Sequence, residues 1–212
     1  MEQMKKYELT NETKEIDGVV LHRIRSLKNF NDVKAGDLGG WIEKDNLSHN
    51  GNCWIYDNAC VYGNAYVHNN AHVYGNACVH DNAHVYDNAH IYGDVYVYDN
   101  SYIYGNAYVY GNAHVCGNAC VYDNAEVYGD ALVNNNANIK SKFDIILFSG
   151  FGTEARTTTA FRCKDTLIRV NCGCFNGTID EFRNRIKETR KGKYAEEYFL
   201  MCNMIERHFR EE

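Results

Sequence analysis

Ala59-Cys-Val-Tyr-Gly-Asn64, Ala83-His-Val-Tyr-Asp-Asn88 and Ala107-Tyr-Val-Tyr-Gly-Asn112 are three copies of one six-residue phrase. The phrase repeats with almost no interruption over residues 53–140, and its aliphatic position holds Ile55, Val61, Val67, Val73, Val79, Val85, Ile91, Val97, Ile103, Val109, Val115, Val121, Val127, Val133 and Ile139. A period of six is a multiple of the strand period of two and not of the helical 3.6. Because β-branched residues also favour strands, the stretch predicts short strands separated by corners.

The corners of this predicted structure are Gly-Asn, Asp-Asn and Gly-Asp pairs. Such pairs tolerate positive φ and let the chain bend sharply after each strand. Three strands and three corners make a triangular coil of 18 residues, so the fifteen hexads predict five stacked coils over 53–140. Alanine and Val or Ile are expected to point inward, where a small residue fits beside the aliphatic one.

The small residue two positions before the aliphatic one, as in Ala71-His72-Val73 and Ala125-Glu126-Val127, resembles the hexapeptide repeat of left-handed parallel β-helix proteins. That family is best known from bacterial acyl- and acetyltransferases. The left hand is implied by the resemblance, because the usual crossover rule favours a right-handed connection. The expected fold class is mainly β: a single-stranded left-handed parallel β-helix, or β-solenoid, with an N-terminal hairpin cap and a small α+β C-terminal domain.

Residues 1–52 predict the N-terminal hairpin and cap. Alternating apolar residues at 7–9 and 19–24, joined around Asp17-Gly18, indicate two strands. A solenoid needs a cap, because an uncovered terminal coil exposes unpaired strand edges and core. Leu38, Trp41 and Ile42 are the side chains expected to cover that open end.

Residues 141–212 predict a small α+β module with strands at 143–148, 157–163 and 166–171. Thr178-Ile-Asp-Glu181 forms a capping box that should open a helix with Phe182 and Ile186 on its apolar side. Gly192 should end this helix, and a second helix is expected over 194–209 with Tyr198, Cys202, Ile205 and Phe209 on one stripe.

Two segments resemble proteins of mobile genetic elements. Residues 36–54 resemble the start of hexapeptide-repeat proteins of phages, prophages and bacteria that are named as transferases. The C-terminal module, marked by Gly150-Phe-Gly152 and Cys172-Gly-Cys-Phe175, resembles a domain of small phage proteins. These resemblances imply a phage or prophage origin.

The charge of the chain is unevenly placed. The net charge is −6, yet residues 45–139 carry 9 acidic side chains and no Lys or Arg. An anionic solenoid disfavours direct nucleic-acid binding and favours docking to a basic protein. The corner carboxylates Asp81, Asp87, Asp99 and Asp123 are expected to contribute to such a contact.

The sequence predicts a cytoplasmic protein without a membrane span. No apolar run approaches membrane length, and the Met1 end, charged and short of apolar residues, is no signal peptide. The nine cysteines are interpreted as free thiols, and no zinc-like spacing points to a metal site. Cys60 and Cys78 should be neighbours one coil apart, where a disulfide or metal pair is conceivable beside the simpler interpretation of soft surface residues.

One face of the predicted prism is strongly aromatic. At 18 residues per coil, its outward positions hold Trp54, Tyr56, His72, Tyr74, His90, Tyr92, Tyr108, Tyr110, Glu126 and Tyr128. Contiguous exposed aromatic area usually marks an interaction site, although tyrosines also stack along a ladder for structural reasons. We expect a binding interface here and self-association as a dimer or trimer.

His72 and His90 on this face are the candidate catalytic residues. In hexapeptide acyltransferases a histidine acts as general base at a cleft between subunits. None of the fifteen hexads carries an inserted loop that would wall a substrate pocket. We therefore favour a non-enzymatic interaction protein without a cofactor, and we expect a phage-encoded inhibitor of a host defence or nucleic-acid-handling protein. The alternative is an acyl-CoA-dependent transferase.

Overall fold

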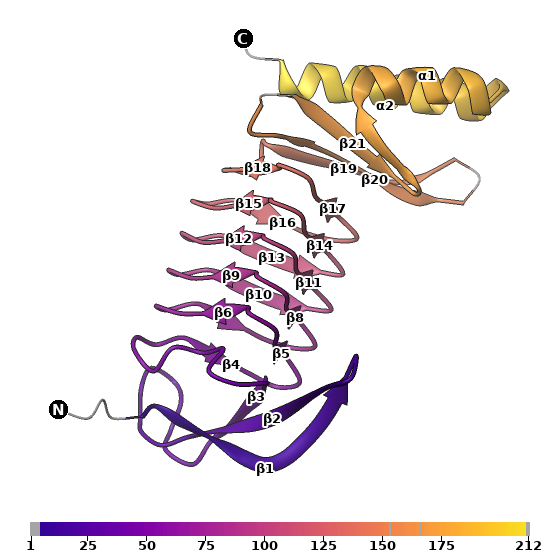
Figure 1. The fold of residues 1–212 in the computed structure, drawn as a ribbon. Helices are drawn as coiled ribbons and strands as arrows, with labels where there is room; N and C mark the ends of the chain where they lie inside the picture. Colours follow the sequence, from indigo (N-terminus) through magenta and orange to yellow (C-terminus); the bar gives the residue numbers. More distant parts are fainter. Residues whose placement is uncertain (1–4, 153, 166, 211–212) are drawn as a thin grey trace.

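The computed structural model describes residues 5–152, 154–165 and 167–210. It is an elongated β-solenoid with a β-hairpin at its N-terminal end and an α+β module at its C-terminal end (Figure 1). The chain is thus mainly β, as the hexad pattern predicts. Among the described residues, no helix has the length and apolar character needed to cross a bilayer.

Three parallel sheets form the three faces of the solenoid. The first face contains β4 (Trp54–Ile55), β7 (His72–Val73), β10 (His90–Gly93), β13 (Tyr108–Gly111) and β16 (Glu126–Val127). The second contains β3 (Leu38–Ile42), β5 (Cys60–Val61), β8 (Cys78–Val79), β11 (Tyr96–Val97), β14 (His114–Val115) and β17 (Leu132–Val133). The third contains β6 (Tyr66–Val67), β9 (His84–Val85), β12 (Tyr102–Ile103), β15 (Cys120–Val121) and β18 (Asn138–Ile139).

The strands pair in the register that a coil of 18 residues requires. Val97 lies opposite Val79 on one side and Val115 on the other, and all three side chains are fully buried. The residues two positions before them, Ala77, Val95 and Ala113, are fully buried as well, with Val95 at the alanine position of the middle coil. The inward assignment of the aliphatic ladder is confirmed.

The solenoid begins one coil earlier than the hexads predict. β3 pairs in parallel with β5, so the expected boundary at residue 53 falls inside the first coil. Gly40 takes the place of the usual alanine, because a Cβ there would lie 2.4 Å from Cγ2 of Ile55 and 2.5 Å from the carbonyl oxygen of Ala59.

The corners are held by side-chain ladders. Five aspartates, Asp57, Asp81, Asp87, Asp99 and Asp123, adopt φ between 53° and 59°, which confirms the corner chemistry. Along one row of corners, the amide of Asn64 donates to Asn82 at 3.1 Å, and Asn82 donates to Asn100 at 3.3 Å. The same spacing of 18 residues recurs in the bonds from Asn70 to Asn88, from Asn88 to Asn106 and from Asn112 to Asp130.

The N-terminal hairpin, β1 (Tyr7–Ile16) and β2 (Val19–Ser26), extends the second face, because β2 pairs antiparallel with β3. The cap differs from the expectation. Tyr7, Ile24 and Val33 join the solenoid core, whereas Leu38 is 46% exposed. Leu38 and Trp41 fail as cap residues because β3 is itself a strand of the first coil.

The C-terminal module is an antiparallel sheet of β19 (Ile145–Phe151), β20 (Arg156–Arg162), β21 (Ile168–Cys172) and β22 (Phe175–Thr178), followed by α1 (Ile179–Thr189) and α2 (Gly192–Phe209). The capping box at the start of α1 is present, and β22 is an additional strand that the sequence did not predict. The expected strand start at Thr166 lies outside the described residues. Phe161 and Cys163 enter the solenoid core, so this sheet closes its C-terminal end.

Candidate functional site

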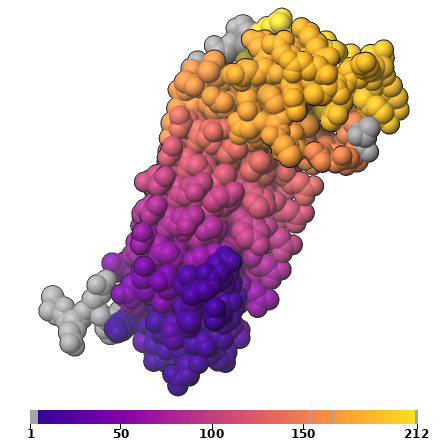
Figure 2. Space-filling model, turned by 45° about the vertical axis from the view of Figure 1, so that its right-hand side comes forward, coloured from indigo at the N-terminus to yellow at the C-terminus, as the bar shows by residue number. Residues whose placement is uncertain are grey.

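A pocket of about 370 Å³ lies between the hairpin and the second face of the solenoid. Lys14, Ile16 and Asp17 line it from the hairpin, and Asn58, Cys60, Tyr62, Asn76, Cys78, His80 and Tyr96 line it from the solenoid. Figure 2 shows the hairpin lying against the first coils. The hairpin therefore supplies the wall that uninterrupted hexads lack.

His80 is the general acid or base candidate of this pocket. Its Nδ1 lies 3.2 Å from the Asp81 carboxylate, and its side chain is 19% exposed. The ring stacks between Tyr62 and Tyr98, with centroid distances of 5.0 and 5.2 Å. A carboxylate on Nδ1 favours the tautomer in which Nε2 can accept a proton.

Two cysteines stand next to this histidine. Cys60 and Cys78 are direct partners of the β5–β8 pairing, and both are free thiols. A hydrogen bond with the Cys78 thiol, helped by Lys14, lowers the pKa of Cys60 to about 6. The same contact raises the pKa of Cys78. The pocket thus holds one acidic thiol, and the hairpin residues Ile16, Val19 and Leu21 cover this cysteine pair.

His72 and His90 lie together on the first face, 5.4 Å apart between ring centroids. His72 is 7% exposed, and burial lowers its pKa to about 4, with His90 adding to the shift. Its Nδ1 has no hydrogen-bond partner among the described residues. Burial also lowers the pKa of His90, whose Nδ1 lies 3.4 Å from the Tyr74 hydroxyl. These two rings form an aromatic stack more than an open catalytic pair.

The tyrosines expected on the first face do not form one continuous stack. Tyr92 stacks on Tyr110 at 5.0 Å, and Tyr110 on Tyr128 at 5.8 Å. Tyr92 and Tyr128 are each 40% exposed. Tyr74 instead stacks on Tyr56 at 4.6 Å. The accessible aromatic surface of the first face therefore consists of the column Tyr92, Tyr110 and Tyr128 with Tyr108 beside it, which we call the tyrosine column.

The N-terminal segment covers the other end of this face. Trp54, expected at the interface, is 1% exposed because the rings of Phe30 and Tyr7 pack on it at 5.5 and 6.5 Å. The Tyr56 hydroxyl donates to Asp32 at 2.9 Å. Trp54 thus belongs to the core, and its assignment to an accessible surface is corrected.

The predicted acidic corners are all engaged within the chain. Asp81 contacts His80, Asp87 accepts from Asn69, and Asp99 accepts from the backbone of Gly117. Asp123 lies 3.9 Å from the Lys140 ammonium, so it has a basic neighbour that the charge count did not anticipate. Among the described residues, no three His, Cys, Asp or Glu side chains converge as metal ligands.

Sequence reasoning missed His80, Lys14 and Asp17 as site residues. The Lys14 ammonium donates to the Asn58 carbonyl at 3.2 Å and lies 4.8 Å from the Trp41 ring centroid. Asp17 accepts from the Tyr62 hydroxyl at 3.3 Å. The apolar residues at the hairpin tip, Ile16 and Val19, were the available signal that this end packs against a partner surface.

One protein family and one known protein match parts of the chain. Residues 101–117 match a family of repeats described as the YdcK β-solenoid repeat. An uncharacterized acetyltransferase, YdcK of Escherichia coli strain K12, is 42% identical over 67 residues. This alignment covers 27% of the chain and 21% of the length of that protein. The matches agree with a hexapeptide-type β-solenoid, and neither bears on phage origin.

Proposed function

We propose that this chain is an acyltransferase that uses an acyl thioester such as acyl-CoA as donor, with the pocket beneath the hairpin as its active site. The observation that carries the proposal is His80, which lines a walled pocket and whose Nδ1 lies 3.2 Å from the carboxylate of Asp81 at the adjacent corner. A histidine oriented by a carboxylate is the usual arrangement of a general base. The similarity to a protein named as an acetyltransferase selects acyl transfer among the reactions that such a pair assists.

The residues of the pocket suit each part of this reaction. Nε2 of His80 takes the proton of an acceptor hydroxyl or amine while the acceptor forms a bond to the thioester carbonyl carbon. The carbon–sulfur bond then breaks, and the departing thiolate receives that proton. The Lys14 ammonium at the pocket wall is placed to stabilise the negative charge on the carbonyl oxygen. A volume of about 370 Å³ accommodates the reacting ends of both substrates.

The test is turnover of acetyl-CoA with a panel of amines and sugar hydroxyls, measured as free CoA by chromatography. His80→Asn should lower turnover by roughly 100-fold or more, the usual contribution of a general base. His84→Asn is the matched control, because His84 stacks on Tyr102 at 5.2 Å as His80 stacks on Tyr98, but on another face. Asp81→Asn should lower turnover less than His80→Asn, because His80 itself remains. Asparagine tolerates the positive φ of 59° at this corner, so the corner should keep its shape.

Two outcomes would overturn this assignment. Turnover that survives His80→Asn but is lost in His90→Ala would move the site to the first face. A folded protein that releases no CoA with any acceptor would remove the enzymatic proposal.

A binding function is the second candidate, favoured by the tyrosine column. Exposed stacked rings on an otherwise polar, acidic rod are suited to hold a partner protein with a basic surface. In this case Tyr110→Asp should abolish partner capture from a bacterial lysate, whereas Tyr104→Asp on the third face should not. Acetyl-CoA binding by calorimetry should then be absent. A phage-encoded inhibitor of a host protein remains a prediction within this second candidate.

A further inference from the structure

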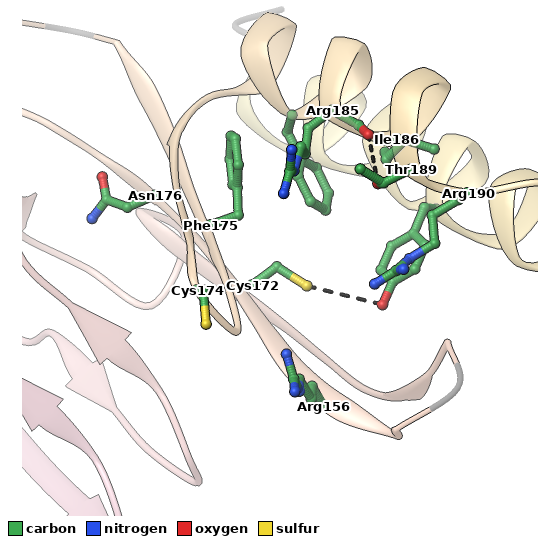
Figure 3. Close-up of a pocket in the computed structure, with 11 residues that line it drawn as sticks. Arg156, Cys172, Cys174, Phe175, Asn176, Arg185, Ile186, Thr189 and Arg190 are labelled. Carbon is green, nitrogen blue, oxygen red and sulfur yellow. Dashed lines mark hydrogen bonds between the residues drawn. The ribbon is translucent and has the colours of Figure 1, made fainter.

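A second pocket, of about 450 Å³, lies in the C-terminal module between the sheet and the two helices. Its lining includes Arg156, Arg185, Arg190, Tyr198, Phe175 and Phe182. In Figure 3 Arg185 reaches the space from α1 and Arg190 from the residue that follows α1, and Arg156 approaches from the opposite side. Three cationic groups therefore converge on one cavity.

Two glycines leave room for the polar groups of this pocket. Gly173, with φ +57°, would place a Cβ 2.4 Å from Nη1 of Arg156. Gly152, with φ +72°, would place one 2.3 Å from the Tyr198 hydroxyl oxygen. Both glycines belong to the motifs that mark the C-terminal module, Gly150-Phe-Gly152 and Cys172-Gly-Cys-Phe175. The backbone here is shaped around the side chains that line the cavity.

The positive charge of the pocket is largely unbalanced. Arg156 forms an ion pair with Glu154, but among the described residues no carboxylate lies within 4.0 Å of the side chains of Arg185 or Arg190. Arg183 on the same helix, in contrast, pairs with Glu206 at 2.8 Å. Two unpaired guanidinium groups beside a cavity form a site for a planar or tetrahedral anion, which arginine binds through paired hydrogen bonds.

The floor of the pocket is aromatic and not charged. Phe175 and Phe182 lie 5.0 Å apart between ring centroids, and Tyr198 meets Phe182 edge-on at 5.8 Å. The hydrogen bond of the Tyr198 hydroxyl within the described part of the chain comes from the Cys172 thiol, at a long 4.0 Å, so the hydroxyl can still donate to a ligand. An aromatic floor beside a cationic rim suits a ligand that has both a flat ring and an anionic group.

We propose that this pocket binds a small phosphate ester with a planar ring, of the mononucleotide class. Arg185 and Arg190 hold the phosphate, Arg156 and the Tyr198 hydroxyl contact its polar part, and the ring packs on Phe175. The site is separate from the proposed acyl-transfer pocket, because the module and the hairpin lie at opposite ends of the solenoid (Figure 1). The inference does not depend on the acyltransferase proposal.

The experiment is calorimetric titration of the full chain with AMP, GMP, CMP and UMP. Adenosine, ribose 5-phosphate, inorganic phosphate and a phosphoserine peptide serve as comparison probes. At least one mononucleotide should bind, and added salt should weaken it. Arg185→Gln and Arg190→Gln should each weaken binding about tenfold or more, the effect of losing a charge-assisted hydrogen bond. Phe175→Leu should reduce the preference for AMP over ribose 5-phosphate.

The matched control is Arg207→Gln, an exposed arginine on α2 that does not line the pocket and should leave affinity unchanged. Thermal melts should show that all variants fold. The proposal is overturned if no mononucleotide binds at millimolar concentration, or if Arg207→Gln weakens binding as much as Arg185→Gln. It is also overturned if inorganic phosphate or the phosphopeptide binds as tightly as every mononucleotide.

Discussion

Cys60 and Cys78 face each other on neighbouring strands of the second face, and their contact lowers the pKa of the Cys60 thiol and raises the pKa of the Cys78 thiol. The Cys78 hydrogen bond lowers the pKa of Cys60 to about 6, below the pKa of an ordinary thiol, which favours the thiolate form at neutral pH. Because the Cys78 hydrogen bond is the main cause, its removal should reverse the shift.

We therefore predict that iodoacetamide labels Cys60 with a pH midpoint near 6, followed by peptide mass spectrometry. Because Cys60 is 4% exposed beneath the hairpin, labelling should be slow, and its rate should fall as the pH drops through this midpoint, since the thiolate is the reactive form. Cys78→Ala should raise the midpoint toward that of a free thiol, and Lys14→Gln should raise it less. Cys202 is an internal control, because burial raises its pKa to about 11. A midpoint near 9 in the unmodified protein would contradict this prediction.

His72 should make the stability of the fold depend on pH. Its pKa of about 4 lies below the 6.5 of an unfolded histidine, so the unfolded chain binds more protons between these values. The free energy of unfolding should therefore fall as the pH drops from 6.5 to 4, by roughly 2 to 3 kcal/mol from this residue. Urea unfolding at several pH values should show a flatter profile in His72→Phe. Tyr74→Phe on the same face should keep the original slope, and an unchanged slope in His72→Phe would refute the assignment.

The aliphatic ladder should not tolerate charge. Val97→Asp places an unpaired carboxylate in the middle of the core and should cost about 4 kcal/mol or more in thermal or urea unfolding. Tyr96→Asp, on the same strand but 42% exposed, is the matched control and should cost far less. Val61→Asp should be as damaging as Val97→Asp, because Ile42 of β3 lies opposite Val61 as a further rung and Val61 is completely buried. A mild effect of both valine variants would contradict the inward assignment.

The tyrosine column should mediate self-association. Four rings of one exposed surface, three of them stacked, offer apolar area that a second copy can bury. Light scattering at micromolar concentration should report a dimer or trimer, and Tyr92→Asp should shift it to the monomer. Tyr104→Asp, which alters the stack Tyr86–Tyr104–Tyr122 on the third face, should leave the assembly intact. A monomeric native protein would leave the column free for a foreign partner.

The solenoid could be predicted from the sequence because every rung repeats the same local environment. In each hexad the Val or Ile side chain points into the core because its neighbours on both sides form corners. The repeat period alone then determines that the coils stack. The repeat pattern does not predict the first coil, because Gly40 replaces the alanine and the chain between Ile42 and Ile55 departs from the six-residue spacing. The sequence does not predict β22 either, because Asn176 and Gly177 are poor strand formers and form a strand here by pairing with β21.

The pocket residues could be predicted only in part, because they depend on contacts between distant segments. The hexads placed His80 and Cys60 outward, but only the docked hairpin encloses them beside Lys14. For the same reason, Trp54 follows the outward pattern and is nevertheless buried, since Phe30 folds over it. Local periodicity determines which way a side chain points and does not determine what later covers it.

The repeat length determines how the two ends of the molecule face each other. Equivalent corners are 18 residues apart, as in the bond from Asn70 to Asn88, and each hexad turns the chain through about a third of a circle. Deleting residues 89–106 would bring the hairpin and the C-terminal module closer by one strand spacing, roughly 4.8 Å, without rotating either. Deleting only residues 89–94 would rotate the module by about 120° about the long axis. Evolution can therefore change the reach of this rod and the angle between its two pockets independently, by inserting or losing whole hexads.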